Sequence, residues 1–181
     1  MHIHLAIVIF WHCVLSRFSH WSHPINHIID RLTFEFSTNV YIRGLFLEIF
    51  NTASVTLPLA DAHELNIVGG GPSWPAVSFD SLPNIHTIRF MIHGSPFRII
   101  GAALADNEHS HQLRSLCSLQ FSYMSFLDED IRDLMDGLKC RILSGFPIEY
   151  IRLDECFRLK QADVMRMEEF VQDVEWDGVV F

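Results

Sequence analysis

A short apolar pattern recurs along this chain and constrains its fold more than any other feature. The pattern places apolar residues at positions one, four and six, and an extended strand turns the last two toward the same face. Six triplets have this form: Ile29, Leu32 and Phe34; Ala62, Leu65 and Ile67; Ile85, Ile88 and Phe90; Leu116, Leu119 and Phe121; Ile148, Ile151 and Leu153; Val171, Val174 and Trp176. Their third positions are 23 to 33 residues apart, which is within or just above the leucine-rich-repeat period of about 20–29 residues.

The segments between these triplets carry apolar residues at helical spacing. The pattern predicts helices over residues 41–53, 97–105, 128–142 and 160–171. We expect Asp128 to cap the third of these helices and Gly145 to end it, because short polar residues satisfy the first N–H groups and glycine accepts a left-handed backbone. The four glycine and proline positions 69–72 interrupt the second unit, and they indicate a flexible turn.

Strands that alternate with helices predict a parallel sheet. Each unit is too small to bury its own apolar face, so the core must form by stacking. The expected fold class is therefore α/β: a leucine-rich-repeat-like solenoid of parallel strands alternating with helices, occupying residues 29–181.

The first 28 residues form a separate apolar N-terminal segment. The run from Leu5 to Trp11 is too short to span a bilayer as a helix. A signal peptide would need basic residues before it and small residues at a cleavage site, and neither is present. The segment is interpreted as a buried helix or a remnant of an upstream repeat. An incomplete gene product without an independent function stays open as an alternative.

The net charge excludes some classes of partner, and the cysteine content indicates a cellular compartment. The formal net charge is −9 and the sequence lacks a basic stripe, so nucleic acid and anionic membrane surfaces are not expected as partners. No pair among the four cysteines has the C-x-x-C spacing of zinc or redox sites. Scattered free thiols are typical of a reducing compartment, which predicts a cytoplasmic or nuclear location.

Histidines are the most obvious candidates for chemistry. His20, His23 and His27 have helical spacing, but Pro24 interrupts any helix there and no cysteine or carboxylate completes a tetrahedral set. No G-x-S-x-G nucleophile elbow occurs. The sequence therefore predicts no catalytic residue, no metal and no cofactor. A small metal-dependent or hydrolytic enzyme that uses the histidine-rich segments is the competing hypothesis.

One unit carries a resemblance to a known family. Residues 147–159 read Pro-Ile-Glu-Tyr-Ile-Arg-Leu-Asp-Glu-Cys-Phe-Arg-Leu, which resembles the cysteine-containing class of leucine-rich repeat. Together with Trp176-Asp177-Gly178 in the last unit, it is similar to the leucine-rich region of fungal F-box proteins over residues 82–181. The resemblance implies a substrate-recognition module of an SCF-type ubiquitin ligase, with cullin-adaptor machinery as a partner. An F-box motif itself is not found in the sequence.

The strand residues between the apolar positions are the expected partner-binding site. In a solenoid they lie on the concave face, away from the helices, and arginine and tyrosine there are typical anchors of protein interfaces. The candidates are Thr33, Glu35, Asn66, Thr87, Arg89, Gln120, Tyr150, Arg152, Asp154 and Glu175. The sequence thus predicts a protein that binds another protein and catalyses no reaction.

Overall fold

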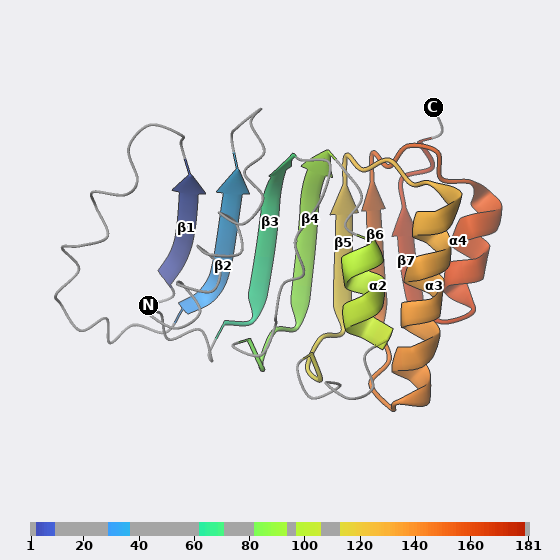
Figure 1. The fold of residues 1–181 in the computed structure, drawn as a ribbon, viewed down its shortest axis with the longest axis horizontal. Coiled ribbons are helices and arrows are strands. Elements are labelled where there is room, and N and C mark those ends of the chain that lie inside the picture. The colour runs from blue at the N-terminus through green and yellow to red at the C-terminus, as the bar shows by residue number, and fades with distance from the viewer. Residues whose placement is uncertain are drawn as a thin grey trace, which may run out of the picture.

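A computed structural model describes residues 3–9, 29–36, 62–70, 82–93, 97–105 and 113–179. Strands and helices alternate in its C-terminal part (Figure 1). The strands are β1 (Ile3–Ile9), β2 (Ile29–Phe36), β3 (Glu64–Gly70), β4 (Thr87–His93), β5 (Ser118–Ser122), β6 (Tyr150–Asp154) and β7 (Asp173–Trp176). The helices are α2 (Phe97–Ala105), α3 (Asp128–Leu143) and α4 (Gln161–Glu168).

All seven of these strands form one parallel sheet in their order along the chain, from β1 to β7. Each new strand therefore adds beside the previous one, and no described strand is inserted between earlier neighbours. The predicted α/β class with parallel strands is confirmed. The expected helix over residues 41–53 lies outside the described residues.

The apolar triplets stand in register across the sheet. Their second positions pair in sequence from Leu32 to Val174, and their third positions pair from Phe34 to Trp176. Ile29, the first position of the first triplet, begins β2. The other five first positions precede their strands and are buried: Ala62, Ile85, Leu116, Ile148 and Val171. A slip of one residue would turn a whole strand's apolar set to the other face, so this periodic pattern specifies the register.

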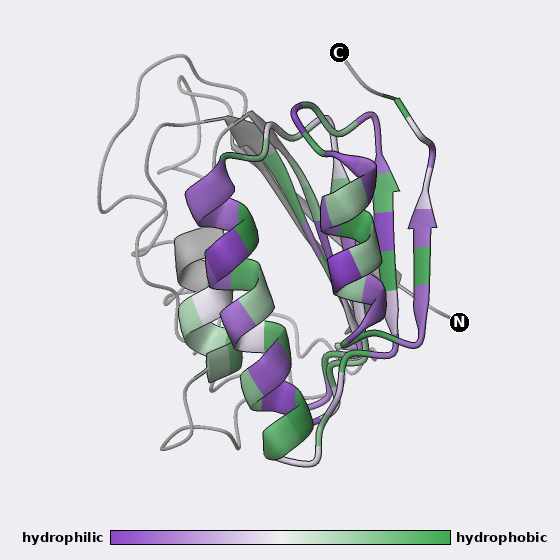
Figure 2. Ribbon diagram, turned by 90° about the vertical axis from the view of Figure 1, so that its right-hand side faces the viewer, coloured by the Kyte–Doolittle hydropathy of each residue, from purple (hydrophilic) through white to green (hydrophobic). Residues whose placement is uncertain are grey.

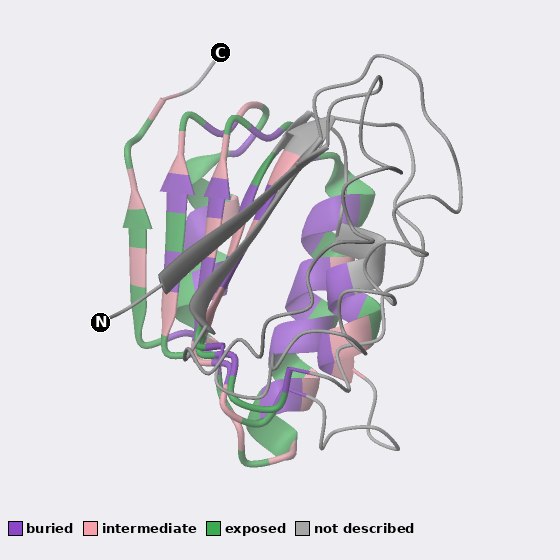
Figure 3. Cartoon of the chain, turned by 90° about the vertical axis from the view of Figure 1, so that its left-hand side faces the viewer, coloured by how far each residue is buried: buried purple, intermediate pink, exposed green. Residues whose placement is uncertain are grey.

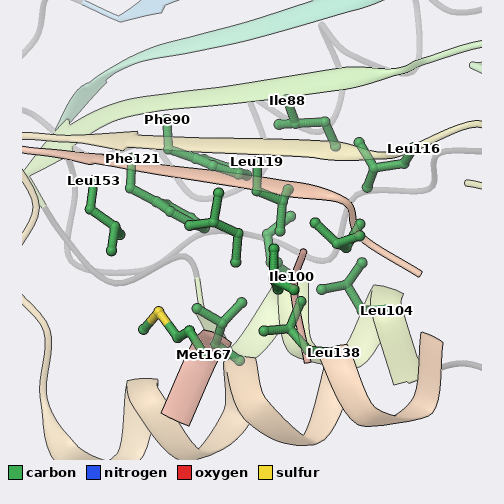
Figure 4. Packing of buried hydrophobic residues seen from close by; sticks show 14 of the residues in the cluster. Ile88, Phe90, Ile100, Leu104, Leu116, Leu119, Phe121, Leu138, Leu153 and Met167 are labelled. Carbon is green, nitrogen blue, oxygen red and sulfur yellow. The ribbon is translucent and has the colours of Figure 1, made fainter. Parts of the chain in front are cut away.

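The three described helices all cover the same face of the sheet (Figures 1 and 2). The core lies between the helices and this face, where buried strand residues meet buried helix residues (Figures 3 and 4). Leu119 and Phe121 point from β5 toward the helices, and Ile100, Leu138 and Met167 point back from α2, α3 and α4. The opposite face of the sheet carries no described helix.

Two consecutive strand-to-helix turns have matching backbone conformations. Tyr123 follows β5 with φ 60°, and Glu155 follows β6 with φ 49°. The turns also bond to each other, because the Tyr123 N–H donates to the Asp154 carbonyl at 3.0 Å and the Phe157 N–H donates to the Met124 carbonyl at 2.7 Å. The unit that contains β5 and the unit that contains β6 therefore stack as structural equivalents.

The start of α3 differs from the expectation. Asp128 does not cap the helix: Leu127 is the N-cap residue, and its N–H donates to the Asp130 carboxylate at 2.8 Å. Lys160 and Asp163 repeat this arrangement at α4, at 3.2 Å. At both helices the acidic side chain accepts this bond from the third helical position, because that position faces back toward the N-cap N–H. The expected end of α3 is correct, since Gly145 has φ 80°.

Two further expectations need correction. Gly69 and Gly70 are not a turn but the end of β3, where they pair with Ile92 and His93. Glycine has a low strand propensity, but backbone pairing overrides it here, with both β2 and β4 at Gly69 and with β4 at Gly70. Gly71 and Pro72 lie outside the described residues. The described part of the N-terminal apolar run is not a helix, because Ile3–Ile9 pairs with β2 as a strand. Its apolar residues are contiguous, which suits a short strand as well as a buried helix.

Candidate functional site

The predicted site residues lie on three adjacent rows of the helix-free face of the sheet. Backbone pairing places six of them in one middle row: Thr33, Asn66, Arg89, Gln120, Arg152 and Glu175. Thr87 and Tyr150 occupy the row toward the strand starts, and Glu35 and Asp154 occupy the row toward the strand ends. The fold therefore brings residues from six strands onto a single surface, which we call the open face.

The open face is accessible where its side chains are described. Thr33 and Glu35 are placed here by backbone register alone. None of the other eight candidates is buried, and Arg152 and Glu175 are exposed. The apolar neighbours in the same strands, such as Ile151 and Leu153, are completely buried. Strand alternation thus separates a core face from a polar face without exception among these residues.

Arg89 lies near the middle of the open face beside a carboxylate of the neighbouring strand. Its Nη1 atom is 3.0 Å from Oε1 of Glu64, and the arginine side chain is 38% exposed against 16% for the glutamate. The ion pair holds the stem of Arg89 against the sheet while leaving more than a third of its surface in contact with solvent. Such a positioned arginine suits a protein contact.

A second polar cluster joins β6 and β7. The Arg152 Nε donates to Asp154 Oδ2 at 2.8 Å, and its Nη1 lies 3.9 Å from Glu175. The Tyr150 hydroxyl donates to the same Glu175 carboxylate. Burial raises the pKa of Tyr150, with the hydrogen bond to Glu175 as the next cause. The hydrogen bond to Asp154 raises the pKa of Arg152, so both side chains stay protonated donors at neutral pH.

Cys156 follows β6 and faces the core. It is completely buried, and its Sγ donates to the Phe121 carbonyl at 3.4 Å and to the Asp154 carbonyl at 3.5 Å. Burial raises the pKa of this thiol to about 12, so it remains neutral and is a poor nucleophile. Its geometry is that of a structural residue beneath the turn that leads to α4.

Two neighbouring histidines at the strand starts were not predicted from the sequence. His63 and His86 immediately precede β3 and β4, and their Nδ1 atoms are 3.1 Å apart. The residues are 23 positions apart, so only the pairing of the two strands brings them together. Across the residues that the structure describes, no three histidine, cysteine or carboxylate side chains gather as a metal-binding group. His20, His23 and His27 lie outside those residues.

Arg141 is a buried cation that the sequence reasoning also missed. It is 4% exposed on α3, and its Nη2 donates to the Leu116 carbonyl at 2.7 Å. Burial lowers the pKa of this side chain to about 10. The guanidinium also lies over the Phe146 ring, 5.8 Å from its centroid. This arginine ties the helix to the loop before β5, and nothing in the local sequence marks it as buried.

The fold and the open face together define the class of this protein: an α/β protein with a sequentially ordered parallel sheet and helices on one face. Comparison with protein-family models, with curated proteins and with solved structures gave no match. No helix within the described ranges is long and apolar enough to cross a membrane.

Proposed function

We propose that this protein is a leucine-rich-repeat-like solenoid that binds another protein through the open face. The observation that carries the proposal is the set of three registered rows, in which polar side chains from successive repeats form one surface free of described helices. Repeat proteins of this kind use their extended sheet surface for recognition, because each added unit enlarges it. Arg89, Tyr150 and Arg152 are the expected anchors of the interface.

The stacked turns after β5 and β6 support the repeat architecture. Equivalent positions hold Tyr123 and Glu155 in the left-handed region, and the following residues, Met124 and Cys156, are both completely buried. The triplet period, the sequential strand order and the one-sided helices agree with the same architecture. The cysteine beneath the turn corresponds to the residue on which the resemblance to cysteine-containing repeats rests.

We further propose that the bound protein is a substrate of an SCF-type ubiquitin ligase, with cullin-adaptor machinery as the second partner. This step depends on the resemblance of residues 82–181 to the leucine-rich region of F-box proteins. The chain's contribution would be recognition, and the chemistry would belong to the ligase.

The test is a charge reversal on the open face. The variants Arg89→Glu and Arg152→Glu should each reduce capture of the partner by about tenfold or more, because they reverse charge at an interface anchor. Tagged wild-type and variant chains would be compared in a eukaryotic extract by quantitative mass spectrometry. Recovery of cullin-adaptor proteins with the wild-type chain would support the ligase assignment.

The matched control is Arg132→Glu, which reverses an exposed arginine on α3. This helix lies on the other side of the sheet, so the variant should retain the partner. Circular dichroism would show that all three variants stay folded. Equal capture by the open-face variants and the wild-type chain would reject the proposed surface.

A further inference from the structure

A shallow cavity of about 380 Å³ opens at the strand-start end of the molecule, between the C-terminal ends of α3 and α4 and the starts of β6 and β7. Its accessible apolar surface comes from the exposed side chain of Ile142 and the half-buried ring of Phe170. Ile148 and Val171 also line the cavity but are only 1% and 4% exposed. The cavity belongs to the ends of the units, and none of the open-face candidates lines it.

The rim of this cavity is acidic. Glu149, Glu168 and Glu169 line it with exposed side chains, and no lysine or arginine is among the lining residues. Arg141 is close in sequence to the cavity residue Ile142, but its guanidinium is directed to the Leu116 carbonyl and the Phe146 ring. The three rim carboxylates therefore lack a cationic neighbour among the side chains that form the cavity.

The two helix ends add to the same negative potential. Ile142 belongs to the last turn of α3, and Glu168 is the last residue of α4. The aligned peptide dipoles of a helix place partial negative charge at its C-terminus. The helix ends and the glutamates thus favour a positive charge at the rim of the cavity, while its apolar side chains favour an aliphatic group.

We propose that this cavity binds an arginine side chain of a partner protein. The aliphatic stem packs on Ile142 and Phe170, and the guanidinium reaches the rim carboxylates. Arginine fits better than lysine because its planar group has five donors that can contact more than one carboxylate, and it is more weakly hydrated. This contact is independent of the open face and of any ligase partner.

The probe is the tripeptide acetyl-Gly-Arg-Gly-amide, titrated into the full chain at low salt and followed by the amide NMR signals of residues 168–172. These signals should shift and saturate. The same peptide with citrulline, the neutral analogue of arginine, should bind at least about threefold more weakly, because it keeps the stem and loses the charge. Free guanidinium, which lacks the stem, should also bind more weakly.

The variant E168Q/E169Q should weaken binding of the arginine peptide by roughly two- to tenfold. Both substitutions are at exposed positions, and an unchanged amide spectrum elsewhere would show that the fold is kept. The control E129Q removes a carboxylate at the opposite end of α3 and should leave the affinity unchanged. Equal binding of the citrulline peptide or of free guanidinium, no saturable shift, or equal weakening by E129Q would overturn the proposal. A loss of partner capture by the open-face variants alone would leave this result unaffected.

Discussion

At the scale of single residues, Cys156 shows how one side chain can connect stability with pH. The thiol is neutral in the folded protein because burial raises its pKa from 9.0 to about 12. An unfolded chain exposes the thiol, so it ionises above its ordinary pKa. The folded state then holds more protons than the unfolded state between about pH 9 and pH 12, and stability must fall as pH rises through this window.

We therefore predict that the wild-type chain loses about 2–3 kcal/mol of unfolding free energy through Cys156 between pH 8 and pH 11. The variant Cys156→Ala lacks this pH-dependent contribution, because it has no thiol at position 156. It should be the less stable protein at pH 8, because it leaves a small cavity, and should lose less stability on going to pH 11. Urea unfolding at both pH values measures the difference between the two proteins.

Other groups that titrate in this range, including Arg141, contribute equally to the pH dependence of both proteins. Their contribution therefore cancels when the variant is compared with the wild type. Cys140→Ala is a useful control, since it removes a thiol whose side chain is only partly buried. An identical loss of stability in wild type and Cys156→Ala would contradict the prediction.

At the scale of elements, the packing of α2 against α3 depends on two facing glycines. A Cβ atom added at Gly101 would lie 2.5 Å from the backbone oxygen of Asp133, and one added at Gly137 would lie 2.9 Å from the Leu104 Cβ. Rotating the end of a flexible side chain would relieve neither clash, because the atoms met are the backbone oxygen of Asp133 and the Cβ of Leu104. The absence of side chains at these glycines allows the two helices to approach closely.

Gly101→Ala should consequently destabilise the protein by about 1–3 kcal/mol, because the helices must separate. Helix propensity alone would predict the opposite, a gain of about 1 kcal/mol. Urea unfolding followed by circular dichroism distinguishes the two. The neighbouring exposed position offers a control, Ala102→Ser, which should change stability by less than about 0.5 kcal/mol. A Gly101→Ala protein as stable as wild type would show that the helix contact is looser than described.

The start of α3 shows which of several carboxylates bonds the first N–H groups of a helix. Asp128 was expected to cap the third helix, and α3 does begin at Asp128, but the carboxylate that accepts a bond from the N-cap N–H is that of Asp130. Several nearby carboxylates can satisfy the same N–H group, and composition does not rank them. The choice depends on which side chain the backbone turn directs toward that group.

At the scale of the whole molecule, the third triplet positions form one row across the sheet, which we call the spine, and its side chains from Ile67 to Leu153 are buried in the core. Phe121 lies inside it, with its ring 5.5 Å from that of Phe90 in a stacked arrangement and 6.0 Å from that of Phe126 at an edge. Trp176 occupies the same row in β7, which pairs only with β6 among the described strands, and it is only half-buried. Position along the sheet therefore sets how much apolar surface each spine residue buries.

This gradient predicts unequal effects of the same truncation. Phe121→Ala should lower the free energy of unfolding by about 3–5 kcal/mol, because it opens a cavity between the rings of Phe90 and Phe126. Trp176→Ala should cost clearly less, although tryptophan is the larger side chain. Equilibrium unfolding in urea, followed at 222 nm, compares them with the wild type. Equal losses would mean that the β7 end is packed as tightly as the interior of the sheet.

Much of the architecture could be predicted from the sequence alone, because the spacing of apolar residues determines which segments form strands and which form helices. Alternating apolar residues in strands and helical spacing between them are local patterns, and six repetitions leave a parallel α/β stack as the consistent arrangement. The register from Leu65 through Ile88 to Leu119 and the exact bounds of α2 agree with these patterns. The open-face candidates followed for the same reason, since whatever alternates with the core must face away from it.

Only the tertiary structure decided the features that depend on residues distant in the chain. The His63–His86 pair, the buried bond from Arg141 to Leu116, the close contact of α2 with α3 and the acidic cavity at the strand starts each join different units. A periodic pattern specifies which face a side chain occupies but not which neighbour it meets. That neighbour depends on the spacing and rotation of the stacked units, which the packing of the whole core sets.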